Sequence, residues 1–224
     1  MNFDLRLYDQ LLQFPLFQGL SRAELSQLAG NTKFGFMKLP ARKPVVAEGQ
    51  PSQQLYFLVG GSIEMSTASD DGGYRVVEQL SAPYLIQPES LFGLHQRYTC
   101  SVRTLAECHF ITLSKDEVLR LLSDFLIIRL NYLGLLATQS HRLAHRPWRR
   151  SPKSLEERIV RFFIDHSSYP AGSKTFHLLM QRLADEVGDS RLDVSRVLNS
   201  MQARQLLQLR RGRIDIPSLE RLLM

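Results

Sequence analysis

The chain has 224 residues, of which 44% are hydrophobic and 22% charged, a balance typical of a soluble globular protein. The longest apolar-rich run, residues 118–137, is interrupted by charged and polar side chains, which argues against a membrane span. The N-terminus has no basic flank before an apolar core, and there are only two cysteines, Cys100 and Cys108. We therefore expect neither a secretory signal nor a disulfide framework, but a cytoplasmic protein with reduced thiols.

The net charge of +6 is concentrated near the C-terminus. Residues 1–140 hold 12 Lys+Arg against 13 Asp+Glu, a net of −1, whereas residues 141–224 hold 16 against 9, a net of +7. A basic end on a nearly neutral body indicates a polyanionic partner at that end, with a solvated charged face as the alternative.

The first part of the chain predicts a helical entry followed by a β domain. Residues 1–30 are helical in pattern, with Ser21 and Glu24 spaced as a capping box. Strand-like runs then follow at 43–50, 54–67, 74–81, 98–105 and 108–114. Asp70-Asp71-Gly72-Gly73 is a hairpin signal. This spacing predicts a small antiparallel barrel or jelly roll.

A long helix is expected to begin at Ser114, with Glu117 completing a second capping box, and to run to about residue 145. It carries two apolar stripes: Leu122, Leu126, Leu130 and Leu133, and Phe125, Ile128, Tyr132 and Leu135. One stripe can face the barrel and the other needs a partner, most simply the same helix of a second chain. We assign dimerisation to Phe125, Ile128, Tyr132 and Leu135; a single buried helix of a monomer is the alternative.

The expected fold class is α+β, in four parts: an antiparallel β jelly-roll sensor barrel at 1–113, a dimerisation helix at 114–146, a linker at 147–153 and a winged helix-turn-helix at 154–224. Pro147 and Pro152 bracket the basic linker because proline interrupts a helix. After the linker, Ser154 and Glu157 predict a capped helix to about residue 166.

Residues 179–201 have the pattern of two helices joined by a tight turn. Gly188 can take the left-handed conformation that the turn requires, and Ser190 follows as N-cap with Asp193 at the third helical position. One face of the pair is apolar: Leu183, Ala184, Val187, Val194, Val197, Leu198 and Met201. The exposed stripe of the second helix, together with its cap, consists of Ser190, Arg191, Leu192, Ser195, Arg196 and Asn199.

That stripe suits the reading of base edges in the major groove, because arginine can bond guanine in a bidentate manner and leucine can contact a thymine methyl. Residues 206–217 then alternate around Arg211-Gly212 as a hairpin wing would. Arg210, Arg211 and Arg213 lie at its tip and are expected to hold DNA phosphates. We predict DNA binding from the order of these features.

Several segments resemble the Crp/Fnr family of transcription regulators. Residues 187–199 and 206–216 resemble its DNA-binding domain, residues 45–66 its cyclic-nucleotide-type barrel, and residues 14–29 and 154–165 its flanking helices. The resemblance implies a homodimer that reads a two-fold related site on double-stranded DNA, and RNA polymerase as a further partner. Leu192 departs from the family, in which many members carry Glu, and Asp193 replaces a frequent Thr, so we do not transfer the family's operator.

The effector is unknown from the sequence, and no cofactor is evident. Where the resemblance implies an Arg-Ser pair for a cyclic phosphate, this chain has Tyr98-Thr99, and Arg97 is one residue out of register. Cyclic AMP is therefore not expected. Two cysteines cannot supply an iron–sulfur cluster. His95, Cys100, Cys108 and His109 are available to a haem, but such isolated residues in strands are usually structural.

No catalytic motif occurs in the sequence, so we do not expect an enzyme. His141 and His145 have a metal-compatible spacing but no nearby carboxylate, and no metal site is expected. The alternative to a DNA-binding regulator is a ligand-binding or protein-interaction module built on the barrel. The basic wing and the arginine stripe argue against it, because protein contacts need neither.

Overall fold

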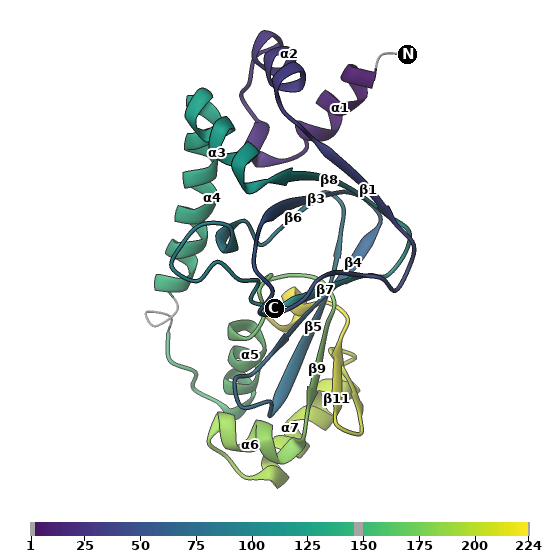
Figure 1. Cartoon of the computed structure of the whole chain (residues 1–224). Coiled ribbons are helices and arrows are strands. Elements are labelled where there is room, and N and C mark those ends of the chain that lie inside the picture. Colours follow the sequence, from purple (N-terminus) through teal and green to yellow (C-terminus); the bar gives the residue numbers. More distant parts are fainter. Residues whose placement is uncertain (1–2, 146–149, 224) are drawn as a thin grey trace. The chain divides into compact units, whose positions relative to one another are not determined.

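The computed structural model, drawn in Figure 1, describes residues 3–145 and 150–223. The chain divides into two compact units. Unit 1 comprises residues 1–63, 81–99 and 103–147, and unit 2 comprises 64–80, 100–102 and 148–224. Residues 64–80 and 100–102 belong to unit 2, although they lie within the part of the chain expected to form the barrel.

Unit 1 consists of helices packed on a four-stranded antiparallel sheet of order β1-β8-β3-β6. Its helical elements are α1 (Phe3–Leu11), the 3₁₀ turn η1 (Pro15–Phe17), α2 (Arg22–Asn31), the 3₁₀ turn η2 (Pro88–Ser90), α3 (Lys115–Asp124) and α4 (Leu126–Ala144). Its strands are β1 (Gly35–Leu39), β2 (Pro44–Val46), β3 (Gln54–Gly60), β6 (Tyr84–Ile86) and β8 (Cys108–Ser114). The sequence reading did not anticipate β1 and β6.

The core of unit 1 lies between this sheet and the helices. Phe14 and Phe17 enter it from the first helical segment and pack against Phe57 of β3, with ring centroids 5.1 and 5.5 Å apart. The expected capping box of α2 is confirmed: Glu24 N–H donates to Ser21 Oγ at 3.3 Å, and Ser21 N–H donates to Glu24 Oε2 at 2.8 Å.

The helix expected over residues 114–146 is instead two helices, α3 and α4, bent by 116° at Phe125. Phe125 has an extended backbone (φ −119°, ψ 105°), which ends α3 while its ring stays in the core. Sequence reasoning had no warning of this break because neither glycine nor proline lies there. The expected N-cap Ser114 is confirmed, since its Oγ accepts Glu117 N–H at 3.2 Å.

The assignment of the dimerisation stripe also needs correction. Phe125, Ile128 and Tyr132 are buried in the core of unit 1, and Leu135 packs against it. Tyr132 additionally donates its hydroxyl to Pro88 O at 2.6 Å, and burial raises its pKa to about 12. The stripe that faces away from the core is the other one, in which Leu126, Leu130 and Leu133 are 61%, 55% and 55% exposed.

In its described residues, unit 2 combines a β-sheet with three α-helices. Its strands follow the order β10-β11-β9-β5-β4-β7: β4 (Ser62–Ala68), β5 (Tyr74–Ser81), β7 (Ser101–Thr104), β9 (Lys174–Leu178), β10 (Gln208–Arg210) and β11 (Arg213–Ile216). Its helical elements are α5 (Leu155–Asp165), α6 (Met180–Val187), α7 (Arg191–Ala203) and the 3₁₀ turn η4 (Leu219–Leu223). The fold class expected from the sequence, antiparallel β domain plus C-terminal helix-turn-helix, is confirmed.

The hairpin expected at residues 70–73 joins β4 and β5. Ser69 N–H donates to Tyr74 O at 3.0 Å, and Gly73 N–H donates to Asp71 Oδ1 at 2.9 Å. Hydrogen bonds from the Ser69 hydroxyl and from Gly73 lower the pKa of Asp71. Strand β9 was missed by sequence reasoning, which assigned no strand between residue 166 and the helix pair.

Candidate nucleic-acid interface

The turn between α6 and α7 is built as expected. Gly188 has φ 67° and ψ 48°, a left-handed conformation that ends α6 without the steric cost a Cβ would add. Ser190 then caps α7, with Asp193 N–H donating to Ser190 Oγ at 3.1 Å. A residue that the sequence reading missed braces the turn from α5: Arg158 donates from Nε to Val187 O at 3.0 Å and forms an ion pair with Asp189.

The two helices meet through the face that was expected to be apolar. Leu183, Ala184 and Val187 of α6 are buried with Val194, Leu198 and Met201 of α7, and Val197 packs against this cluster. The opposite face of α7 is consequently available to a partner. We call the residues expected to contact base edges the reading stripe. Five of them are exposed, namely Ser190, Arg191, Leu192, Arg196 and Asn199, and Ser195 is half-buried.

Within the reading stripe, Leu192 is 60% exposed and the Arg196 side chain 69% exposed. Arg196 is not free, however, because its Nη1 lies 2.9 Å from Asp193 Oδ1. The other carboxylate oxygen of Asp193 accepts the Ser190 hydroxyl at 2.6 Å. Asp193 therefore joins the cap of α7 to one of its arginines, a link that spacing alone did not indicate.

The wing consists of β10 and β11, which pair Leu209 with Ile214 and turn at Gly212 (φ 66°). Two of its three arginines are held by one carboxylate: Asp215 lies 2.7 Å from Arg213 and 3.6 Å from Arg210. Burial alone would raise the pKa of Asp215, but hydrogen bonds from Arg213 and Thr175 lower it overall. Within the part of the chain that the structure describes, Arg211 is exposed and makes no ion pair.

Strand β9 completes the winged unit and carries a buried ion pair. It pairs with β11 on one side and with β5 on the other. Lys174 of β9 places Nζ 2.8 Å from Glu78 Oε1 of β5, and both side chains are almost fully buried. The two Glu78 oxygens also accept the backbone N–H groups of Ser168 and Tyr169, at 3.0 and 3.1 Å.

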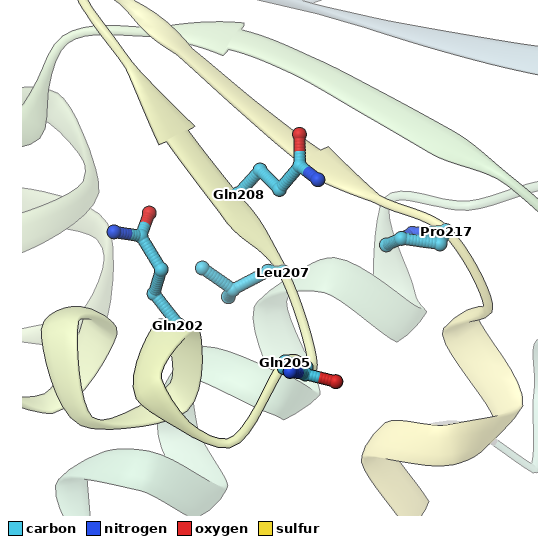
Figure 2. A pocket seen from close by; sticks show the side chains of 5 residues that line it. All are labelled: Gln202, Gln205, Leu207, Gln208 and Pro217. Atoms are coloured by element: carbon cyan, nitrogen blue, oxygen red, sulfur yellow. The ribbon is translucent and has the colours of Figure 1, made fainter.

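A cavity of about 390 Å³ lies between the C-terminal end of α7 and the wing (Figure 2). Its lining residues are Gln202, Gln205, Leu207, Gln208 and Pro217. The amide oxygen of Gln202 accepts Leu209 N–H at 2.6 Å, which ties the helix end to the wing. The lining carries no charged side chain, so we assign no ligand to this cavity.

In unit 1, the chain around residues 88–99 is the part expected to correspond to a cyclic-phosphate site. Gln87 is buried, and its Oε1 accepts Thr99 N–H at 2.7 Å and the Thr99 hydroxyl at 2.8 Å. Arg97 donates to Gly49 O at 2.6 Å from an exposed position. The amide oxygen of Gln87 thus accepts both Thr99 donors, and the segment's arginine bonds a backbone carbonyl.

The cysteines and histidines considered as haem or metal ligands have separate surroundings of their own. Cys100 and Cys108 are buried, and burial raises the pKa of the Cys108 thiol. His95 is exposed, and the His109 ring lies 3.4 Å from Glu107. His141 and His145 stack with centroids 6.2 Å apart. Among the described residues, no group of three or more His, Cys, Asp or Glu could hold a metal ion.

No single helix in residues 3–145 or 150–223 is long and apolar enough to cross a membrane, although α3 and α4 would reach that length and composition if the 116° bend is disregarded.

Comparison with known proteins identifies both parts of the chain. A family model described as "Cyclic nucleotide-binding domain" matches residues 36–125, and one described as "Crp-like helix-turn-helix domain" matches residues 157–224. A "CRP-like cAMP-activated global transcriptional regulator" of Mycobacterium tuberculosis is 24% identical over 219 residues, 95% of this chain and 96% of the relative. The "CRP-like protein Clp" of Xanthomonas campestris is 27% identical over 184 residues, 77% of this chain and 80% of the relative.

Solved structures with the same fold include the catabolite activator protein of Thermus thermophilus, with a TM-score of 0.52 and 20% identity. The alignment covers 94% of this chain and 97% of that one. The sensor domain of the regulator DNR from Pseudomonas aeruginosa has a TM-score of 0.54 and 22% identity, covering 69% of this chain and 99% of that one. At this level of identity the likeness shows the fold alone.

Proposed function

Because the chain belongs to the Crp/Fnr family of transcription regulators, we propose that it reads a two-fold related DNA site as a homodimer. The family consists of DNA-binding regulators, not enzymes. In this proposal each protomer inserts α7 into the major groove of one half-site, and the wing contacts the flanking backbone.

The observation that carries the proposal is the one-sided burial of α7. Val194, Leu198 and Met201 anchor the helix in the core of unit 2, whereas Arg191 and Leu192 project from its first turn. An exposed leucine beside an arginine offers one apolar and one bidentate polar contact to neighbouring base pairs. The N-terminal end of the helix, capped by a serine, also favours a phosphate nearby.

The homodimer is proposed through the exposed stripe of α4. Leu126, Leu130 and Leu133 follow one another at helical spacing on one face, and Gly134 and Ala137 keep the neighbouring surface low. A second copy of α4 is the occupant that matches this stripe, because an isologous contact sets leucine against leucine across a two-fold axis. The same axis would set two copies of α7 against a two-fold DNA site.

The remaining parts of the proposal concern partners and location. RNA polymerase is proposed as a further partner, and the cytoplasm as the location, because a transcription regulator acts on chromosomal DNA. We leave the effector unassigned and propose that it is not cyclic AMP, because Gln87 already accepts both Thr99 donors.

The test is selection of a preferred operator from random duplexes, followed by gel shift at fixed salt. Arg191→Ala and Arg196→Ala should each lower affinity for the selected operator by about 1–3 kcal/mol, roughly 5- to 150-fold, and relax the preference at one position. Arg221→Ala, which removes an exposed arginine from η4, is the matched control and should change affinity less than about twofold. Sequence-specific binding that survives both stripe substitutions contradicts the assignment of α7.

A further inference from the structure

The strongest unassigned feature of unit 1 is the surrounding of the Gln87 side chain. Its Oε1 accepts Thr99 N–H at 2.7 Å and Thr99 Oγ–H at 2.8 Å, and the Ser90 hydroxyl approaches it at 3.4 Å. Three donors from two segments thus converge on one oxygen atom. Gln87 and Ser90 are only 5% and 4% exposed, whereas Thr99, which supplies two of the three donors, is exposed.

Convergent N–H and O–H donors are the arrangement that proteins use to hold an oxyanion. Gln87 fills this position from an unusual backbone conformation, with φ 38° and ψ 58°, which a residue with a Cβ rarely adopts. Such a conformation persists where surrounding contacts hold it. The hydrogen bonds to Oε1 are among those contacts.

We propose that Gln87 is a built-in occupant of an oxyanion cradle formed by Thr99 and Ser90. The chain itself supplies the oxygen that a phosphate-bearing effector would otherwise place there. A cyclic nucleotide would have to displace a buried amide and would find no guanidinium in the cradle, since Arg97 bonds Gly49 O. The inference deepens the proposed function, because it makes DNA binding independent of cyclic nucleotides.

Two substitutions test the cradle by thermal unfolding of the full chain with and without inorganic phosphate or cyclic AMP. Gln87→Gly keeps the positive φ accessible and vacates the cradle, which then offers N–H and O–H donors but no guanidinium. Phosphate should therefore bind it weakly, and its Tm should rise only at millimolar phosphate. Gln87→Met fills the space without an acceptor, so its Tm should fall below that of the wild type and should not respond to phosphate. The wild type should respond to neither ligand.

The proposal is overturned if the wild type gains Tm with cyclic AMP, or if Gln87→Met is as stable as the wild type. It is also overturned if a folded Gln87→Gly variant does not respond to phosphate. These outcomes are separate from the DNA proposal: a wild type that binds no operator would contradict the reading by α7 and leave the cradle intact.

A second inference rests on different residues, those that join β5 to β9. Residues 74–78 of β5 pair with residues 174–178 of β9 in an antiparallel ladder. Val76 is part of the core of unit 2, and the Tyr74 ring meets Phe162 edge-on at 5.6 Å. By sequence, however, this hairpin lies inside the span matched by the cyclic-nucleotide-binding model.

Two charged contacts lock the hairpin to the helix-turn-helix. The Glu78–Lys174 ion pair is buried between β5 and β9. In the described part of the chain, the Lys174 ammonium has no well-directed hydrogen bond. Arg182 of α6 lies 2.8 Å from Asp71 at the hairpin tip and stacks 5.7 Å from the centroid of the Tyr74 ring. A buried ion pair contributes little net stability, but separating it leaves an uncompensated charge, so it specifies one register.

We infer that the β4–β5 hairpin is a structural part of the DNA-reading unit and couples the sensor segment to α6 and α7. The Glu78–Lys174 pair is the positioning contact of this coupling. A shift of β5 against β9 would separate the pair and disturb the strand that supports the wing. This inference rests on the proposed function only for its DNA readout.

The test is a double-mutant cycle in the full chain. Glu78→Gln and Lys174→Met should each weaken operator binding at least tenfold and speed hydrogen exchange of the β9 amides, while β3 and β8 remain unchanged. The double variant should regain most of the operator affinity and most of the β9 protection. The amide introduced by Glu78→Gln can still accept the N–H groups of Ser168 and Tyr169, and no buried charge is left without its partner. The coupling is overturned if the single variants leave hydrogen exchange in β9 unchanged, or if the double variant binds the operator more weakly than either single variant. If hydrogen exchange in β9 recovers in the double variant but neither the wild type nor any variant binds an operator, the proposed function is contradicted and the coupling is not.

Discussion

Truncation of Leu130 to alanine should weaken the proposed dimer by a calculable amount. The substitution removes three carbon atoms, each worth about 0.8 kcal/mol when fully buried. Because 55% of Leu130 is exposed in the single chain, roughly that share becomes buried on association. The two-fold axis doubles the loss to about 2.6 kcal/mol per dimer, which corresponds to about an 80-fold increase in the dimer dissociation constant.

Sedimentation equilibrium over a concentration series measures this constant directly. Leu119→Ala is the matched control, because Leu119 is a 47% exposed leucine on α3, off the stripe, and its truncation should leave the constant within about twofold. The reasoning is refuted if Leu130→Ala dimerises as tightly as the wild type, or if the wild type is a monomer at micromolar concentration. A weakened dimer should also bind a full two-fold operator less tightly while half-site affinity is kept.

Three further predictions concern unit 2. Arg211→Ala should weaken binding to all duplexes alike and reduce the slope of log K against log salt by about 1, measured by fluorescence anisotropy across salt concentrations. Asp193→Ala should lower unfolding stability by no more than about 1 kcal/mol, since its contacts are exposed, but should narrow the ratio of specific to non-specific affinity by freeing Arg196. Burial and neighbouring arginines lower the pKa of His177, so the unfolded chain binds the proton more readily than the folded one. The contribution of His177 to the free energy of unfolding should therefore be fully present above about pH 6.5 and decrease as the pH falls below that value. His177→Gln should flatten that decline in urea titrations between about pH 7.5 and 5.5, and an unchanged slope would contradict it.

The helix-turn-helix was predictable because its determinants are local. Gly188 and Ser190 specify a turn and a cap within three residues, and helical spacing separates the buried face from the reading face without knowledge of distant segments. The capped start of α2 was predictable for the same reason. Each of these features depends on residues only a few positions apart.

The features that sequence reasoning missed depend on partners far along the chain. Lys174 and Phe176 alternate onto one face of β9, but a lysine at such a position normally indicates solvent. Its partner Glu78 lies 96 positions earlier, in a segment assigned to the sensor. The wing posed the same difficulty, since nothing local showed that Asp215 would hold Arg210 and Arg213. Nor did anything local show that Arg211 would make no ion pair with the residues that the structure describes.

Helical periodicity could not predict which apolar stripe of α4 faces the core and which is left for a second chain. Both faces of α4 are apolar, so the spacing predicts two packing partners, the core of unit 1 and a second chain. It does not predict which stripe packs against which partner. The choice depends on the bend at Phe125, which turns Ile128 and Tyr132 into the core and leaves Leu130 outside. Aromatic residues with a polar tip need a buried acceptor, which Pro88 O supplies to Tyr132, whereas leucine needs only apolar surface. The stripe of plain leucines is therefore the one that a second, identical chain can cover without any further polar partner.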